Sequence, residues 1–404
     1  MTPEKFFQSK TAIVTLFAAC FVVLISLGVR QVFGLFFIDF NESLNISNTA
    51  FGFAIGIQML MWGLTGPIFG AIADRYGGHK AIISAFLFYT LGIYFLYTGP
   101  NTGIFFQIHM GLLIGIGLGG TAISIPMSIV GKHFPLSTRT IAMSFVTAVG
   151  SFGYFLSPIF TNYSLREFGW NYTLFVFFLF LLSGLFAAYF VRSPSKTENL
   201  EKKSNQTIKE ALSEAFKSKS YILLVLGFFV CGFQITLVAT HIPGYIQQKG
   251  LPDWTAPAIL ALIGFFNIFG TIGMGFLASK YSKKILLSIL YFSRGIILIL
   301  FLFLPSSTFT ALAFGVLFGI LWLATIPPTN GIVAQIFGTK YLATLFGIVF
   351  FSHQVGSFLG AYLGGYFFDT YGSYDYAWYL SIILSAFAGF VHLPIDEKPI
   401  LTTA

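Results

Sequence analysis

The sequence predicts an all-α membrane protein whose twelve transmembrane helices form two pseudo-symmetric six-helix bundles. Three observations lead to this fold class. The composition is 56% hydrophobic and only 9% charged, with a mean hydropathy of +0.83, so lipid is the expected solvent for most side chains. The chain divides into twelve apolar segments, and its two halves repeat each other in order. We therefore do not expect a water-soluble enzyme.

Each apolar segment is long enough to cross the membrane as a helix, because about 20 residues span the hydrocarbon core of roughly 30 Å. Lipid cannot pair with backbone amides, which favours helices. Lys5 and Lys10 precede the first segment as in a secretory signal peptide, but this segment is too long for one. The expected helices span 11–38, 50–73, 80–98, 103–131, 140–163, 170–191, 221–247, 255–279, 283–304, 308–336, 340–368 and 374–394.

The positions of the basic residues predict how the chain is oriented, because loops rich in Lys and Arg stay on the cytoplasmic side. Of the 22 Lys and Arg residues, only Arg166 and Lys249 fall in loops on the other side, and Arg30 and Arg294 fall within helices. We expect a multi-pass protein of the bacterial inner membrane with both termini cytoplasmic. The net charge of +8 then reports topology, since the cations do not gather on one face as nucleic-acid binding requires.

One polar segment, 192–220, divides the chain into an N-terminal bundle over 1–191 and a C-terminal bundle over 221–404. Its apolar residues are spaced as on one face of a helix. The segment is expected to be a cytoplasmic linker with a short surface helix, whose apolar residues are Ile208, Leu212 and Phe216.

The two halves match at an offset of about two hundred residues in four places that follow the same order. One such match could arise by chance, whereas four in order indicate two homologous bundles. Parallel repeats of this kind build alternating-access transporters. The matching pairs are 70–76 with 275–281, 111–116 with 315–320, 129–134 with 332–337, and 149–152 with 355–358.

The segment GAIADRYGGHK, from Gly70 to Lys80, resembles the signature between helices 2 and 3 of the major facilitator superfamily. In that family the acid and the basic residues form a cytoplasmic charge relay that biases the inward and outward states. The resemblance implies that Asp74, Arg75 and Lys80 are gating residues. The second copy has Ser279 in place of the acid, so its relay is expected to be weaker.

Two further segments look like the monocarboxylate and oxalate:formate exchanger branch of that family. They are 28–37, which contains Arg30, and 227–243 in helix 7. The branch typically carries an Arg in helix 8, where this sequence has Asn267 and Thr271. The buried cation of the second half is instead Arg294, in helix 9.

Arg30 and Arg294 are the cations that lipid tolerates least, because a charge near the bilayer centre costs about 2.5–3.5 kcal/mol. All 14 acidic residues fall in loops or at helix ends, so no buried carboxylate is expected to neutralise either arginine. An unpaired guanidinium favours an anionic ligand and matches a carboxylate bidentately. We therefore predict an organic anion as substrate. The alternative is that each arginine binds helix-end carbonyls or extends toward the interface.

Other polar residues within the apolar segments extend the predicted substrate site. A histidine, with His353 the first candidate, or the carboxylate of the substrate would carry a coupled proton. His109 is expected to make a helix–helix hydrogen bond instead. The predicted substrate-binding residues are Arg30, Gln31, Gln234, His241, Asn267, Arg294, Asn330, His353 and Gln354, and the further cavity candidates are Gln58, Trp62, Tyr154, Tyr245, Trp322 and Thr325.

Motifs for cofactors and catalysis are not expected. Cys20 and Cys231 lie in apolar runs, which suggests neither a disulfide nor a metal site. Gly115, Gly117 and Gly120 spell a dinucleotide-binding pattern, but inside a membrane helix, where small residues serve close packing. No paired carboxylates or nucleophile and base are seen within the helices.

The leading functional prediction is a secondary transporter that moves a small, monocarboxylate-like organic anion by alternating access, coupled to protons or to anion exchange. We expect a monomer in the lipid bilayer, without cofactor, metal or nucleic acid. The alternatives are an efflux transporter for a drug or neutral metabolite, and a membrane-embedded enzyme or sensor.

Overall fold

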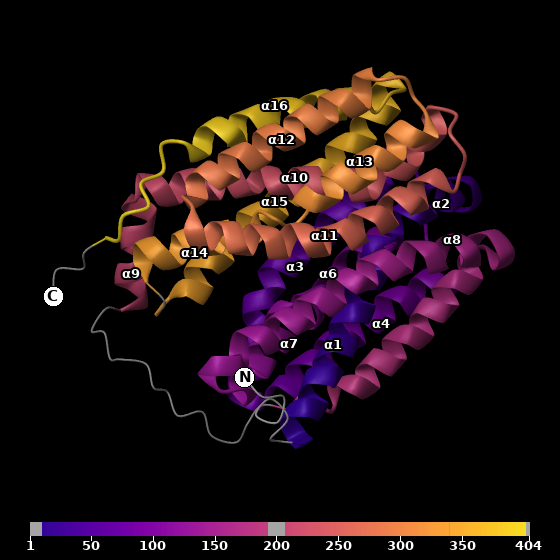
Figure 1. Ribbon diagram of the computed structural model, residues 1–404. Helices are drawn as coiled ribbons and strands as arrows, with labels where there is room; N and C mark the ends of the chain where they lie inside the picture. The colour runs from indigo at the N-terminus through magenta and orange to yellow at the C-terminus, as the bar shows by residue number, and fades with distance from the viewer. Residues whose placement is uncertain (1–9, 193–206, 339, 401–404) are drawn as a thin grey trace.

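The computed structural model describes residues 10–192, 207–338 and 340–400, and these residues form helices and no strand. Figure 1 shows the helices of the first half of the chain on one side of the molecule and those of the second half on the other. The predicted fold class is confirmed. We call the two groups the N-terminal bundle (10–192) and the C-terminal bundle (219–400).

In the N-terminal bundle two of the predicted single spans, 11–38 and 103–131, are divided into shorter elements. Its elements are α1 (Lys10–Gln31), the 3-10 turn η2 (Phe33–Phe36), α2 (Phe37–Leu44), α3 (Asn48–Tyr76), α4 (Gly78–Thr98), α5 (Ile104–Phe106), the π-helix η3 (Gln107–Leu113), α6 (Ile114–Thr121), α7 (Ser124–His133) and α8 (Leu136–Ala188).

The C-terminal bundle follows a short helix, α9 (Ile208–Lys217). Its elements are α10 (Lys219–Gln248), α11 (Thr255–Lys280), α12 (Lys283–Phe303), α13 (Thr308–Leu321), α14 (Ile326–Phe337), α15 (Leu342–Tyr371) and α16 (Asp375–His392).

The 53 residues of α8 contain two of the predicted spans. Gly169 interrupts the helix with φ 79°, a conformation that glycine adopts without steric cost. A single helix of this length would measure roughly 80 Å, more than twice the hydrocarbon core. Ten helices among the described residues are long and apolar enough to span a membrane when α8 is counted once, and α16 is not among them. Dividing α8 at Gly169 and adding α16 gives the twelve predicted crossings.

Two predicted spans, 103–131 and 308–336, are broken at related positions. The first breaks at Ala122, which is extended, and the second between Leu321 and Ile326. Each break is followed by a proline in the first turn of the next helix. These prolines are Pro126 in α7 and Pro327 in α14. Broken membrane helices expose backbone carbonyls that must find partners within the protein.

The linker contains the predicted short helix, α9. Thr207 caps its first turn in a reciprocal capping box with Glu210. The backbone N–H of Thr207 donates to the Glu210 carboxylate and thereby holds the pKa of this carboxyl below its ordinary value. The linker lysines Lys196, Lys202 and Lys203, like Lys5, lie outside the described residues.

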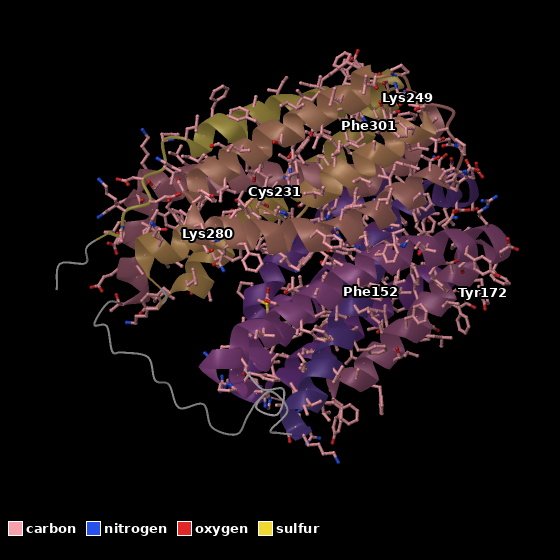
Figure 2. The ribbon with its side chains drawn as sticks, in the orientation of Figure 1. Phe152, Tyr172, Cys231, Lys249, Lys280 and Phe301 are labelled. Atoms are coloured by element: carbon pink, nitrogen blue, oxygen red, sulfur yellow. The ribbon has the colours of Figure 1, made fainter. Side chains whose placement is uncertain are left out.

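The two ends of the molecule differ in charge. The basic end carries the loop cations of both bundles, such as Arg75, Lys132 and Lys284, and the opposite end carries Asp253 and Asp369. Figure 2 shows Lys280 at the basic end and Lys249 at the opposite end of the C-terminal bundle. Two helix pairs, α3 with α15 and α8 with α11, form the boundary between the bundles.

Candidate functional site

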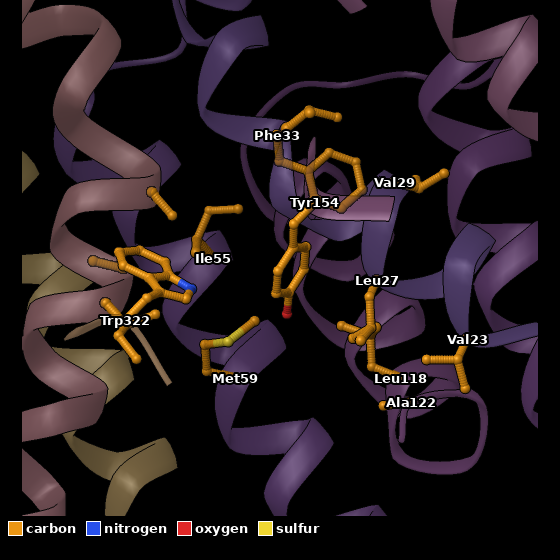
Figure 3. Packing of buried hydrophobic residues seen from close by; sticks show 14 of the residues in the cluster. Val23, Leu27, Val29, Phe33, Ile55, Met59, Leu118, Ala122, Tyr154 and Trp322 are labelled. Atoms are coloured by element: carbon orange, nitrogen blue, oxygen red, sulfur yellow. The ribbon is translucent and has the colours of Figure 1, made fainter. Parts of the chain in front are cut away.

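A small crevice with Arg30 in its wall lies where the two bundles meet. The N-terminal bundle contributes most of its lining and the C-terminal bundle contributes α10; the lining residues are Arg30, Gln31, Phe33, Gly34, Ile55, Gln58, Ala239 and Thr240. Its volume is about 10 Å³, room for about one water molecule. Figure 3 shows Phe33, Ile55, Met59 and Tyr154 in the apolar core of this region, with Trp322 of the C-terminal bundle nearby.

Arg30 is 7% exposed and has weak partners within the protein. Its Nη1 donates to Gln31 Oε1 over 3.4 Å, and its Nη2 lies 3.1 Å from the thioether sulfur of Met59. A guanidinium carries five donors, and a thioether is a poor acceptor. Neither ion pair recorded among the described residues involves Arg30. The guanidinium thus retains most of its capacity to bind an anion.

The bundles are packed tightly against each other at the opposite end. A Cβ added to Gly52 of α3 would collide with the carbonyl oxygen of Ala361 in α15. In the same way, Gly34 beside α1 faces the carbonyl of Ala239, and Gly264 of α11 faces the backbone of Tyr154. Glycine is required at these positions because backbone of one bundle approaches backbone of the other.

Hydrogen bonds between α3 and α15 also close the opposite end. Asp369 of α15 accepts from the backbone N–H of Thr49 over 2.7 Å and from Asn48 Nδ2 over 2.9 Å. The Tyr374 hydroxyl donates to Asn48 Oδ1. Asp369 therefore places a carboxylate at the first turn of α3, where unpaired backbone N–H groups and the helix dipole favour negative charge.

Toward the basic end the same helices separate. Trp62 of α3 still contacts Phe350 of α15, with ring centroids 5.8 Å apart. Beyond this contact, Gly70 of α3 and Gly347 of α15 have nothing within 4 Å of their Cβ positions. Figure 1 shows the two bundles close together near α2 and farther apart near α7 and α14. The two bundles are thus in contact at the opposite end and separated at the basic end.

Arg294 lies inside the C-terminal bundle and is fully buried. Its Nη2 donates to the carbonyl oxygens of Leu321 and Trp322, each over 2.6 Å, and its Nη1 donates to Gln234 Oε1 over 3.2 Å. These carbonyls are the ones released by the break between α13 and α14. The contacts of Arg294 match the alternative stated for it above, in which protein carbonyls satisfy the guanidinium.

The other predicted residues of α10 also point into the C-terminal bundle. Gln234 donates to Ser385 and to the carbonyl of Ser381 in α16. His241 Nε2 lies 2.6 Å from the carbonyl of Ala361. Because each of these side chains has its partners within one bundle, the structure does not bring them to the crevice.

The remaining predicted residues lie nearer the boundary between the bundles. Asn267 of α11 donates to Ser151 of α8 over 3.0 Å and so connects the bundles. Gln354 lies against Gly63 of α3, and its Oε1 is 3.0 Å from His353 Nδ1. Asn330 of α14 is half-buried, with Oδ1 unpartnered.

The three predicted gating residues lie at the basic end, but they do not pair with one another. Asp74 forms an ion pair of 2.9 Å with Lys132 of α7, and Arg75 lies over the ring of Tyr76. Lys80 is exposed in the first turn of α4. Asp74 is 73% exposed, so this pair is worth about 1 kcal/mol or less.

Replacing Arg294 by glutamine is expected to lower stability, because the carbonyls of Leu321 and Trp322 would lose their donor. Loss of hydrogen bonds to a buried charged group costs on the order of 3 kcal/mol. We expect the midpoint of thermal unfolding, followed by tryptophan fluorescence in detergent, to fall by several degrees. Arg30→Gln is the matched control and should leave the midpoint unchanged or raised. An Arg294→Gln protein as stable as the parent would contradict this role.

Sequence reasoning did not select several residues that the structure brings together. Met59, which contacts Arg30, and Thr240, which lines the crevice, are uncharged residues of apolar helices, so no charge marks them in the sequence. The sequence predicts Asp369 only as an acid at a helix end, close to the membrane. A usable signal was present, because Asp74–Gly77 and Asp369–Gly372 share the pattern Asp-X-Tyr-Gly at the ends of α3 and α15.

Among the described residues, no group of three or more His, Cys, Asp or Glu side chains is arranged to hold a metal.

The chain is similar to known transporters over most of its length. Monocarboxylate transporter 12 of Mus musculus is 23% identical over 93% of this chain and 84% of its own length. The sialic acid transporter NanX of Escherichia coli is 23% identical over 75% of each chain.

A solved structure has the same fold. It is a bacterial homologue of the human lysosomal transporter Spinster, described as inward-facing and unoccupied, with a TM-score of 0.79, 15% identity, and coverage of 95% of this chain and 97% of its own. The family model described as Major Facilitator Superfamily matches residues 19–324 and 293–403. Together with the two bundles and the signature at Gly70 to Lys80, this match shows that the chain belongs to the Major Facilitator Superfamily.

Proposed function

We propose that this protein is a secondary transporter that moves a small, monocarboxylate-like organic anion across the membrane by alternating access. The observation that carries the proposal is Arg30, a buried guanidinium at the meeting point of the bundles without a carboxylate partner. A cation held in a low-dielectric site favours an anionic ligand, and the fork of a guanidinium matches the two oxygens of a carboxylate.

Two further observations support an anion as cargo. The similar proteins named above are described as transporters of monocarboxylates and of sialic acid, and both kinds of compound are carboxylic acids. The second arginine, Arg294, is bound by carbonyls of its own bundle, so the proposal rests on Arg30 alone. Gln31, which contacts Arg30, is the second residue we assign to the site.

The orientation we propose follows the charge of the two ends. The basic end faces the cytoplasm of a bacterial cell, because cationic loops stay on that side. The structure, parted at the basic end, then represents an inward-open state. The crevice has room for about one water, so it must widen for a larger ligand, by the same movement of the bundles that transport requires.

The proposal is tested by uptake of radiolabelled L-lactate into proteoliposomes, compared with protein-free liposomes. Unlabelled lactate is expected to inhibit uptake, whereas lactamide, a neutral compound of almost the same shape, is expected to inhibit at least tenfold less, because it offers no charge to Arg30. A pH-sensitive dye inside the vesicles shows whether protons accompany the anion. Equal inhibition by both compounds would contradict an anion site and favour a carrier of neutral metabolites.

A further inference from the structure

The amide of Gln58 is held in one orientation, and this leaves a hydrogen-bond acceptor at the crevice. Gln58 Nε2 donates to the backbone carbonyl of Met110 over 2.9 Å. A carbonyl oxygen only accepts, so the nitrogen of the amide must be the atom that faces Met110. The other atom, Oε1, is buried and has no partner. Because Gln58 also lines the crevice, its free oxygen is an acceptor that a ligand can reach once the crevice widens.

Gln31 is oriented by the same logic, but it leaves a donor. Its Oε1 receives the hydrogen bond from Arg30 Nη1, and a guanidinium only donates. Its Nε2 is buried without a partner. The residues of the crevice therefore present one guanidinium, one free amide NH2 group and one free amide oxygen. Buried polar groups are almost always hydrogen-bonded, so a ligand that supplies both an acceptor and a donor would satisfy these unpaired atoms.

The three groups line one crevice and are therefore available to one ligand. Arg30, Gln31 and Gln58 line the same crevice, so a small compound held there after the crevice widens could contact all three. A carboxylate accepts from Arg30 and from Gln31 Nε2. A hydrogen-bond donor on the neighbouring carbon would then lie at Gln58 Oε1.

We propose that Gln58 makes the transporter selective for carboxylates that carry a hydrogen-bond donor next to the carboxylate, that is, for 2-hydroxy acids. This inference rests on the proposed anion site at Arg30 and adds the group that distinguishes one carboxylate from another. A deoxy analogue leaves the Gln58 oxygen unpaired. A 2-keto analogue places a second acceptor against it. A site that binds a substrate hydroxyl discriminates against analogues that lack it for this reason.

The test is competition in proteoliposomes, with a trace of labelled L-lactate and unlabelled L-lactate, propionate or pyruvate as inhibitor. In the parent protein, lactate is expected to reach half-inhibition at a concentration roughly tenfold lower than propionate or pyruvate. A tenfold difference in affinity corresponds to the free energy of about one hydrogen bond. In Gln58→Met the three half-inhibition concentrations should agree within about twofold, because inhibition by lactate weakens while inhibition by propionate does not change. An unchanged propionate value shows that the variant is folded.

Gln107→Met is the matched control. Gln107 also donates through Nε2 to a backbone carbonyl, that of Ala50, and also leaves a buried Oε1 unpaired, but it does not line the crevice. It is expected to keep the preference for lactate. Equal inhibition by lactate and propionate in the parent protein would overturn the selectivity while leaving the anion site in place. A preference that survives Gln58→Met would overturn the role of Gln58. Absence of lactate uptake in the parent protein would overturn both proposals.

Discussion

Arg30→Gln is expected to reduce carboxylate transport by roughly 100-fold or more in kcat/KM, equivalent to about 2.7 kcal/mol. Among the described residues that line the crevice, Arg30 is the one cation, and its present partners are an amide oxygen and a thioether sulfur. Arg30→Lys keeps the charge but not the planar fork, so it should retain part of the activity. The measurement is the initial rate of labelled lactate uptake against lactate concentration.

Arg166→Gln serves as the control for Arg30→Gln. It removes the same charge from an exposed position in α8 and is expected to transport at the parental rate. Since Arg30 contributes little bonding to the fold, the Arg30→Gln protein should be as stable as the parent, which separates loss of transport from loss of structure. Parental kinetics in Arg30→Gln would show that the anion does not bind at this residue.

Gly52→Ala is expected to prevent closure of the opposite end and to shift the protein toward a state that is open there. The added methyl group meets the carbonyl of Ala361 in α15, and backbone cannot move aside as a flexible side chain can. Overpacking of this kind costs about 1–3 kcal/mol. Since the states of a transporter differ by only a few kcal/mol, this cost is enough to change which state predominates.

The shift is measured as a distance between spin labels at Asn45 and Asp253, two exposed positions at the opposite end, one in each bundle. The labels are attached after replacement of both native cysteines. We expect the distance to lengthen by several ångströms in Gly52→Ala. Gly70→Ala, in the same helix but with nothing near its Cβ, should leave the opposite end closed. An unchanged distance in Gly52→Ala would show that this contact does not hold the end closed.

The fold was predictable because a membrane imposes a length on every apolar segment. Most predicted spans differ from the observed helices by a few residues, as in α10 and α11. What the apolar pattern did not reveal is where helices break. The break after Leu321 lies inside a segment that is apolar throughout, and Arg294, which binds the carbonyls freed there, comes from another helix.

The candidate site was predictable only in part. A sequence shows which residues are charged, but it does not show in which direction each side chain points. Arg30 and Arg294 look alike as unpaired cations, yet carbonyls of a neighbouring helix bind one and a thioether contacts the other. Gln234 and His241 share a face of α10, but nothing in their spacing tells which bundle that face meets. Asp369 accepts hydrogen bonds from the first turn of α3 only because α15 ends beside that turn.

The central claim, that Arg30 binds the anion between the bundles, is tested most directly by locating a bound carboxylate. An experimental structure with 2-bromopropionate would reveal the bromine by its anomalous scattering and the carboxylate beside it. We predict that the carboxylate lies within hydrogen-bonding distance of the Arg30 guanidinium, in the crevice lined by Gln31, Gln58 and Thr240. A carboxylate bound elsewhere, with Arg30 still in contact with Met59, would contradict the claim.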